Sequence, residues 1–157
     1  MILIIAGTQT KQFERLFKVV DNAIQKGIIN DDVVAQLGYT KFKSPNMKTF
    51  DFIEEAELNK YIKKADLIVS HGGIGSITSS IKADKKVFAM ARLEKFKEHK
   101  NDHQLQIVNK FHDLGYIRKI EDYDDFIREY KNLNKFKPKK PKFGNTKIID
   151  IITEFIG

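Results

Sequence analysis

The most constraining feature of this sequence is a glycine-rich turn that joins an apolar run to a helix-like segment. Ala65–Val69 predicts a buried strand, and Ile77–Lys82 predicts the first turns of a helix. Between them lies Ser70-His71-Gly72-Gly73-Ile74-Gly75-Ser76. Such a turn directs free backbone N–H groups and the positive end of the helix dipole at one point, and glycines let a phosphate come close. The segment therefore predicts a phosphate pocket, with a simple tight turn as the alternative.

Strand-like and helix-like stretches alternate along residues 1–130. Strands are expected over Ile2–Ala6, Val33–Leu37, Thr49–Ile53, Leu67–Ser70, Lys86–Ala91 and Tyr116–Ile120. Helices are expected around the apolar series Phe13, Leu16, Phe17, Val20 and Ile24, and over Ala56–Lys64, Ile74–Lys82, Asp102–Leu114 and Tyr123–Tyr130. This alternation predicts the α/β class: a single Rossmann-like domain with a mostly parallel sheet covered on both faces.

Three polar segments each follow a predicted strand: Gly7-Thr8-Gln9, the turn Gly72–Ser76, and Arg92–Gln104. Parallel sheets of this class bind ligands beyond the carboxyl ends of their strands. Whatever the strand order, we therefore expect these segments to meet at one edge. The residues predicted to contact nucleotide phosphates are Gly7, Thr8, Gly72, Gly73, Gly75, Ser76 and Arg92.

Two side chains of the glycine turn have alternative roles. His71 can donate a hydrogen bond to a phosphate or sugar oxygen, or it can simply bond a neighbouring loop. Ser76 can cap the helix as well as bind phosphate. No acid occupies this helix before Asp84, so ribose hydroxyls would be held by Ser79 or Ser80, by backbone, or by another segment.

A second polar cluster, Glu98-His99-Lys100-Asn101-Asp102-His103-Gln104, crowds the start of the next predicted helix. Gln104 offers a donor and an acceptor, which suits sugar hydroxyls, and Asp102 is expected at the N-cap or first turn. A metal site would use His99, Asp102 and His103, but their spacing matches no metal-binding motif. We expect no metal and no cofactor, and no Ser/His/Asp set suggests nucleophilic catalysis.

Composition favours a cytoplasmic globular protein. The 157 residues contain no cysteine, which excludes disulfides and thiolate metal sites. The apolar start Met1–Gly7 lacks a basic leader and predicts a strand rather than a signal peptide, and no apolar run has the length of a membrane span.

The net charge of +7 is concentrated near the C-terminus. Residues 131–145 are expected to form a linker with two prolines and six lysines: Lys131, Lys135, Lys137, Lys139, Lys140 and Lys142. Residues 146–157 are expected to form an amphipathic helix that packs on the domain, on a partner or on a membrane. The basic run fits an anionic membrane surface, an acidic partner or a solvated linker. Nucleic acid is disfavoured, because the usual alternation of aromatic and basic residues is missing.

The two motifs together resemble a known family. Ser70–Ser76, then Ala91-Arg92-Leu93, then Glu98-His99-x-x-Asp102-His103-Gln104 are similar to the carboxyl-terminal domain of family 28 glycosyltransferases. The resemblance runs from Met1 to about Ile120. It is strongest to stand-alone versions: the soluble subunit of the dolichol-linked N-acetylglucosamine transferase, and small subunits of bacterial exopolysaccharide and capsule glycosyltransferases. The second motif favours the bacterial type. Relatives often carry a glutamate where Ser79 stands, and proline within Ala89–Ala91.

The resemblance implies half of a two-domain B-type glycosyltransferase, with residues 1–130 binding a UDP-sugar as substrate. Transfer would invert the anomeric centre without an obligatory metal, and the glycine turn would stabilise the UDP leaving group. Asp102 and Gln104 would hold sugar hydroxyls, and His71 and His103 would be catalytic. A membrane-anchored partner subunit would present a lipid-linked sugar acceptor, recruiting this chain to the inner face of the cell membrane. The resemblance does not say whether the general base that deprotonates the acceptor hydroxyl belongs to the partner or to this chain.

Two other functions remain open from sequence. A non-catalytic nucleotide-sugar-binding scaffold, which enhances a partner enzyme, is suggested by the missing ribose acid. A basic nucleic-acid-binding domain is suggested by the charge alone.

Overall fold

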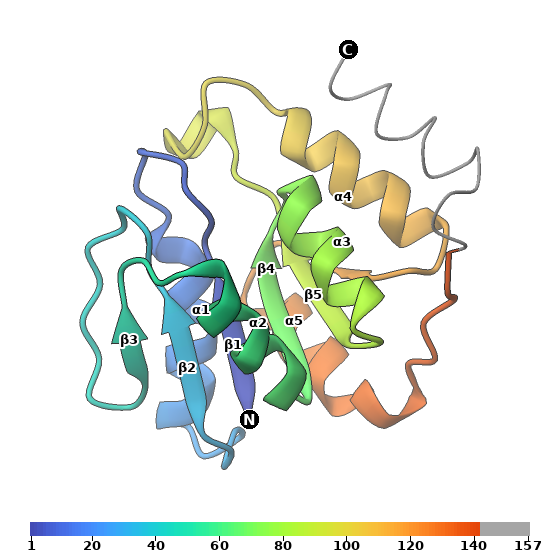
Figure 1. Cartoon of the computed structure of the whole chain (residues 1–157), viewed down its shortest axis with the longest axis horizontal. Coiled ribbons are helices and arrows are strands. Elements are labelled where there is room, and N and C mark those ends of the chain that lie inside the picture. The colour runs from blue at the N-terminus through green and yellow to red at the C-terminus, as the bar shows by residue number, and fades with distance from the viewer. Residues whose placement is uncertain (142–157) are drawn as a thin grey trace.

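A computed structural model describes residues 1–141. Its centre is a six-stranded sheet in the order β3-β2-β1-β4-β5-β6, and every strand pair is parallel (Figure 1). The strands are β1 Ile2–Ile5, β2 Val33–Gln36, β3 Lys48–Phe50, β4 Leu67–His71, β5 Lys86–Met90 and β6 Arg118–Lys119. The predicted α/β class and single Rossmann-like domain are confirmed, and the sheet is wholly parallel in the described part of the chain.

Five α-helices cover the sheet within residues 1–141. They are α1 Glu14–Gln25, α2 Glu55–Lys64, α3 Ile74–Lys82, α4 His103–Asp113 and α5 Tyr123–Lys131. Helices α1 and α5 pack on one face, and α2, α3 and α4 on the other (Figure 1). Strand β1 shows how the sequence builds both layers: Ile2 and Ile4 join the first core, whereas Leu3 and Ile5 join the second. Its unbroken apolar run is therefore that of a strand buried on both sides.

The predicted element boundaries differ from the observed ones by at most three residues, and α3 agrees at both ends. Strand β6 is the clearest case, because only Arg118 and Lys119 pair with β5. Tyr116, Ile117 and Ile120 gave the segment its strand-like pattern, but they are buried beside this short edge strand without extending it. Strand β4 is longer than predicted and includes His71, which pairs in register with Met90.

The segment after α5 stays in contact with the domain as far as it is described. Leu133–Lys135 forms a 3-10 turn, the backbone N–H of Lys139 donates to the Gly115 carbonyl, and Pro141 is buried. The division into residues 1–130, 131–145 and 146–157 stays a prediction, since the expected C-terminal helix lies outside the described residues. Within the described part, no helix has the length and apolar character needed to cross a bilayer.

Candidate functional site

The parallel sheet brings the three predicted loops to one edge, as expected. Gly7 follows β1, the glycine turn follows β4, and Arg92 follows β5. His71 and Gln104 lie where these loops meet, and both side chains are buried. Hydrogen bonds connect His71 to Ser76 of α3 and to Gln104 of α4. The candidate site therefore combines groups from the loops after β1, β4 and β5 with groups from helices α3 and α4.

The His71 ring is held between two glycines. A Cβ built on Gly7 would lie 2.4 Å from the His71 Nε2 atom, and one on Gly73 would lie 2.2 Å from the ring Cε1 atom. Real Cβ atoms essentially never approach so closely, so any larger residue at either position would displace the imidazole. Gly72 makes room in the same way for helix α4, since a Cβ built on Gly72 would lie 2.8 Å from the Gln104 Cβ. These three glycines make room for side chains of the protein itself.

The Gln104 amide fixes which nitrogen of His71 carries the proton. Its Oε1 atom accepts hydrogen bonds from the backbone N–H groups of Gly72 and Arg92, each at 3.1 Å. The amide nitrogen, which can only donate, consequently faces His71 Nδ1 at 3.3 Å. Nδ1 is thus the acceptor, and the neutral ring carries its hydrogen on Nε2, 3.2 Å from the Ser76 Oγ atom. His71 is built as a hydrogen-bond donor at this edge.

The stability of the protein is expected to fall as the pH drops from about 6.5 toward 3. Burial first, and then the positive charge of Arg92, lower the pKa of His71 from 6.5 to about 3. In this window the unfolded chain binds a proton at His71 and the folded chain does not, so acid favours unfolding by about 1.4 kcal/mol per pH unit for this group.

Urea unfolding of the wild type and the His71→Gln variant at several pH values measures this contribution. Burial also lowers the pKa of His99 and His112, but both proteins keep these residues, so the difference between the two slopes isolates His71. Identical slopes in the two proteins would contradict the assignment.

The first turn of α3 is the open part of the site. Its N-cap is Gly73, without a side-chain cap, and Ser76 bonds His71 instead of capping the helix as predicted. Among residues 1–141, the backbone N–H groups of Ile74, Gly75 and Ser76 have no hydrogen-bond partner. Gly75 is exposed, and a Cβ there would meet nothing within 4 Å. A helix terminus with free donors and open space has the geometry that suits an anion.

Arg92 acts inside the protein rather than at its surface. The side chain is 1% exposed and its guanidinium donates to the carbonyl oxygens of Ala6, Lys11 and Glu98. It also lies over the Phe13 ring, 4.8 Å from the centroid. Burial lowers its pKa to about 10, which leaves it charged at neutral pH. Its geometry is that of a positioning residue that ties the loop after β5 to the loop after β1.

An ion pair that the sequence did not suggest supports the same loops. Arg15 of α1 binds both carboxylate oxygens of Glu98, at 2.8 and 3.2 Å, and also donates to the Ala91 carbonyl. Glu98 is buried and accepts from the Leu93 backbone N–H. Glu98 belongs to the second motif of the family resemblance, but 83 positions separate it from Arg15, so only the fold reveals their pairing.

The remaining predicted residues are exposed at the rim. Asp102 is the N-cap residue of α4, yet its carboxylate accepts from the Glu94 N–H, while Asn101 caps the His103 N–H. Thr8, His103 and Ser79 are also exposed. Within residues 1–141 no group of three or more His, Asp or Glu side chains converges in a way that could hold a metal ion.

A small hollow of about 140 Å³ adjoins the glycine turn. Gly7, Thr8 and Ser76 line one side, and Ile5, Gln36, Phe52, Ile53 and Leu58 complete it. The Gln36 amide braces this side, because its Oε1 accepts from the Gly7 N–H and its Nε2 donates to the Gly7 and Asp51 carbonyls. Apolar walls beside the open helix terminus are suited to a ring attached to an anionic group.

The sequence profile of the glycosyltransferase family 28 C-terminal domain matches residues 1–151. The chain belongs to this family. A family relative, the UDP-N-acetylglucosamine transferase subunit ALG13 of Candida albicans, is 30% identical over 113 residues, which cover 69% of this chain and 37% of the relative. The chain spans less than half the length of the curated ALG13 relatives it matches.

Solved structures agree with the fold of this family 28 domain. The solution structure of ALG13 superposes with a TM-score of 0.59 at 19% identity, covering 90% of this chain and 89% of the solved ALG13 chain. The UDP-GlcNAc 2-epimerase of Methanocaldococcus jannaschii, solved with UDP-GlcNAc and UDP, superposes with a TM-score of 0.63 at 14% identity, covering 99% of this chain and 44% of the epimerase. At these identities the likeness concerns the fold alone.

Proposed function

We propose that this chain is the donor-binding subunit of an inverting glycosyltransferase, which moves a sugar from a UDP-sugar to a lipid-linked acceptor. The observation that carries the proposal is the set of free N–H groups at the start of α3 beside the fixed Nε2–H of His71. Membership of family 28 supports the reaction class. The name of the ALG13 relative, a UDP-N-acetylglucosamine transferase subunit, supports both the donor type and the subunit role.

In this proposal the diphosphate of the donor lies over Gly75 and the first turn of α3. Ser76 accepts from His71 Nε2–H, so its own hydroxyl hydrogen is free to donate to a phosphate oxygen. Charge that develops on the departing UDP is stabilised by these donors and by the helix dipole. The hollow behind Phe52 receives a flat ring of the nucleotide.

The geometry separates the two predicted catalytic histidines. His71 already holds its proton on Nε2 and its Nδ1 is occupied by Gln104, so it serves as a donor and not as a base. His103 is exposed at the start of α4, and in this proposal it meets the incoming acceptor hydroxyl. Gln104 holds the ends of β4 and β5 through backbone bonds, while Asp102 is the exposed group placed to meet sugar hydroxyls.

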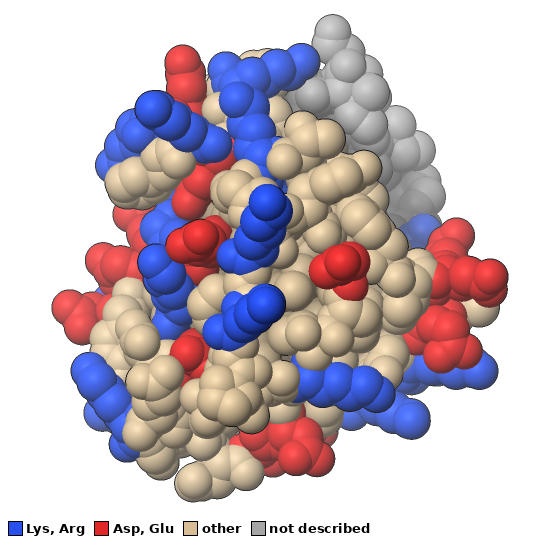
Figure 2. All heavy atoms as spheres, turned by 90° about the vertical axis from the view of Figure 1, so that its left-hand side faces the viewer, with Lys and Arg blue, Asp and Glu red and all other residues tan. Residues whose placement is uncertain are grey.

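Surface charge supports an anionic substrate. Figure 2 shows the side of the molecule that carries β3: Lys and Arg side chains gather toward its upper rim, with Asp and Glu side chains among them and much uncharged surface at the centre. Exposed lysines of the loops at the carboxyl edge are Lys11, Lys41, Lys43, Lys95, Lys97 and Lys100. Such a rim attracts a nucleoside diphosphate and an acceptor phosphate alike.

The proposal extends to a partner and a place in the cell. A membrane-anchored subunit would supply the other half of the B-type enzyme and the acceptor site, holding this cytoplasmic chain at the inner face of the cell membrane. The bacterial form of the second motif supports a role in exopolysaccharide or capsule synthesis. A partner that transfers sugar slowly without this chain would favour the scaffold function instead.

The Gly75→Ala variant is expected to bind UDP at least about tenfold more weakly than the wild type, because its methyl group occupies the space proposed for a phosphate. Its stability is expected to stay equal or to rise by up to about 1 kcal/mol, since alanine favours a helix more than glycine does. Amide NMR titrations with UDP measure the affinity, and urea unfolding measures the stability.

The same titrations with GDP and ADP are the specificity controls. Shifts at Gly72–Ser76 that saturate with UDP and are weaker with the other nucleotides support a UDP-sugar site. Equal affinity of Gly75→Ala and wild type for UDP would place the phosphates elsewhere. No shift with any nucleotide, in this chain or in its complex with the partner, would overturn the donor-binding function.

A further inference from the structure

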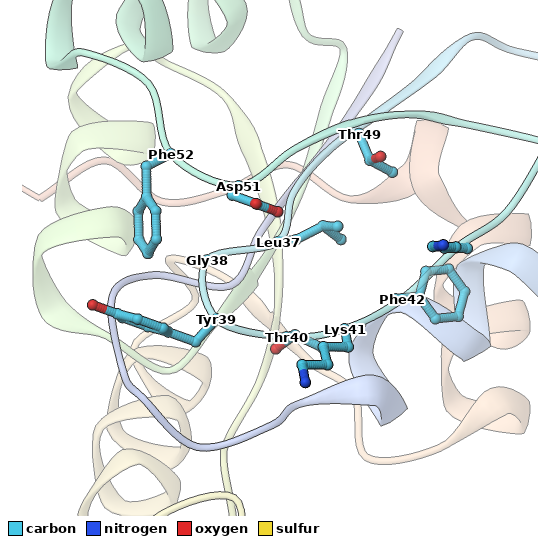
Figure 3. Close-up of a pocket in the computed structure, with 10 residues that line it drawn as sticks. Leu37, Gly38, Tyr39, Thr40, Lys41, Phe42, Thr49, Asp51 and Phe52 are labelled. Carbon is cyan, nitrogen blue, oxygen red and sulfur yellow. The ribbon is translucent and has the colours of Figure 1, made fainter.

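A large cavity in the described residues lies beyond the ends of β2 and β3. Its volume is about 780 Å³. The loop Gly38–Lys43 forms one wall, and the segment that leaves β3 forms the other (Figure 3). The lining residues that matter for its chemistry are Tyr39, Lys41, Thr49, Asp51 and Phe52. Nothing in the donor-binding proposal uses this cavity.

Two exposed aromatic rings stand at one end of the cavity. Tyr39 is 52% exposed and Phe52 is 48% exposed, and their rings meet edge to face with centroids 5.1 Å apart (Figure 3). Phe96 is the third exposed large apolar side chain of residues 1–141, but the guanidinium of Arg15 lies 4.9 Å from its ring centroid. Within this described range, the Tyr39–Phe52 pair is the aromatic surface that no such group covers.

The wall that carries Tyr39 is held in place by polar bonds. Gln12 holds the loop on both sides of Thr40: its amide nitrogen donates to the Tyr39 carbonyl, and its oxygen accepts from the Lys41 N–H. The buried Thr40 hydroxyl accepts from the Phe13 N–H. Further along, buried Asp21 of α1 accepts from the Ser44 hydroxyl and the Asn46 amide. A ligand would therefore meet a ring whose backbone is already ordered, which lowers the entropy cost of binding.

Polar groups surround the aromatic pair. The Asp51 carboxylate points into the cavity (Figure 3), and among residues 1–141 neither it, the Thr49 hydroxyl nor the Lys41 ammonium has a hydrogen-bond or ion-pair partner. A pyranose ring has an apolar C–H face and a rim of hydroxyls. Its C–H groups suit the negative face of an aromatic ring, and its hydroxyls suit a carboxylate acceptor and an ammonium donor.

We infer that this cavity binds a sugar ring of the saccharide acceptor, stacked on Tyr39 with hydroxyls bonded to Asp51. The inference rests on the proposed function, because it assigns the other substrate of the same reaction. Phe52 lines both this cavity and the hollow beside Gly7 and Ser76, so the acceptor sugar lies next to the donor site. The subunit that binds the donor thus also contributes to the choice of acceptor.

Saturation-transfer NMR on the full chain tests this site with methyl glycosides of glucose, galactose, N-acetylglucosamine and glucuronic acid as probes. We expect at least one probe to bind saturably to the wild type. The Tyr39→Ala variant is expected to bind that probe about tenfold more weakly, whereas Tyr39→Phe keeps the ring and retains binding. Phe96→Ala is the matched control, since it removes an equally exposed ring outside the cavity and leaves the affinity unchanged.

UDP titration of the same variants separates this inference from the donor site. Unchanged UDP affinity in Tyr39→Ala, together with lost glycoside binding, supports the acceptor site. Failure of the wild type to bind UDP counts against the proposed function and not against glycoside binding. The inference is overturned if no glycoside saturates the wild type, if Tyr39→Ala binds the glycoside normally, or if the variant's only effect is to abolish self-association in sedimentation measurements.

Discussion

The Arg92→Met variant is expected to unfold with a free energy about 3 kcal/mol or more below that of the wild type. Methionine fills similar space but removes the donors that satisfy the carbonyl oxygens of Ala6, Lys11 and Glu98. Buried acceptors without partners are costly, and the loops after β1 and β5 lose their direct connection. Urea unfolding followed by circular dichroism measures the loss.

The control for this experiment is Arg128→Met, which makes the same substitution at an exposed arginine of α5. Its side chain is 58% exposed and pairs with Asp125 at 3.0 Å, so the expected change is within about 0.5 kcal/mol. If Arg92→Met lost no more stability than this control, the three carbonyl bonds would not be structural, and a direct role of Arg92 in phosphate binding would gain weight.

The Gly7→Ala variant is expected to lose about 2 to 4 kcal/mol of stability and to disturb the site as well. Gly7 has φ +79°, which costs an alanine about 1 to 2 kcal/mol, and the new methyl group would press on the His71 ring. The displaced imidazole could no longer hold its bonds to Ser76 and Gln104. We expect altered His71 ring signals in NMR spectra and weaker UDP binding.

Gly27 offers a matched comparison, because its φ is +74° and a Cβ there would meet nothing within 4 Å. Gly27→Ala therefore carries the backbone strain alone. The difference between the two variants, measured by urea unfolding, reports the contact with His71. Equal losses of stability would mean that the His71 ring moves aside at no energetic cost, and that its position between the glycines does not contribute to stability.

The architecture could be predicted from sequence because it depends on local patterns. Apolar runs such as Ile2–Ile5 mark strands buried on both faces, and helical spacing marks the layers that cover them. Parallel pairing then places every carboxyl end at one edge, so Gly7, His71 and Arg92 share that edge whatever the strand order. Their contact depends on β1, β4 and β5 being neighbours, which only the structure shows. The boundaries of β6 were less predictable, because apolar residues beside an edge strand imitate its continuation.

The roles of individual site residues could not be predicted in the same way. The sequence shows four glycines suited to a phosphate, but only the fold shows that Gly7 and Gly73 accommodate His71 and that Gly75 is left open. The Arg15–Glu98 ion pair joins segments that are far apart in the sequence, and no local sequence pattern predicts such a contact. The same is true of the cavity at Tyr39, whose walls come from two loops that are polar and irregular in sequence.

The strand order also has a consequence for synthesis on the ribosome. Strand β1 is made first, yet it lies between β2 and β4, and Leu67 must be made before it can pair with Ile2. Until then one side of β1 is an open edge of four apolar residues, and such edges invite aggregation. We therefore expect nascent chains that end before β4 to aggregate more readily than longer ones, because β4 covers the open side of β1.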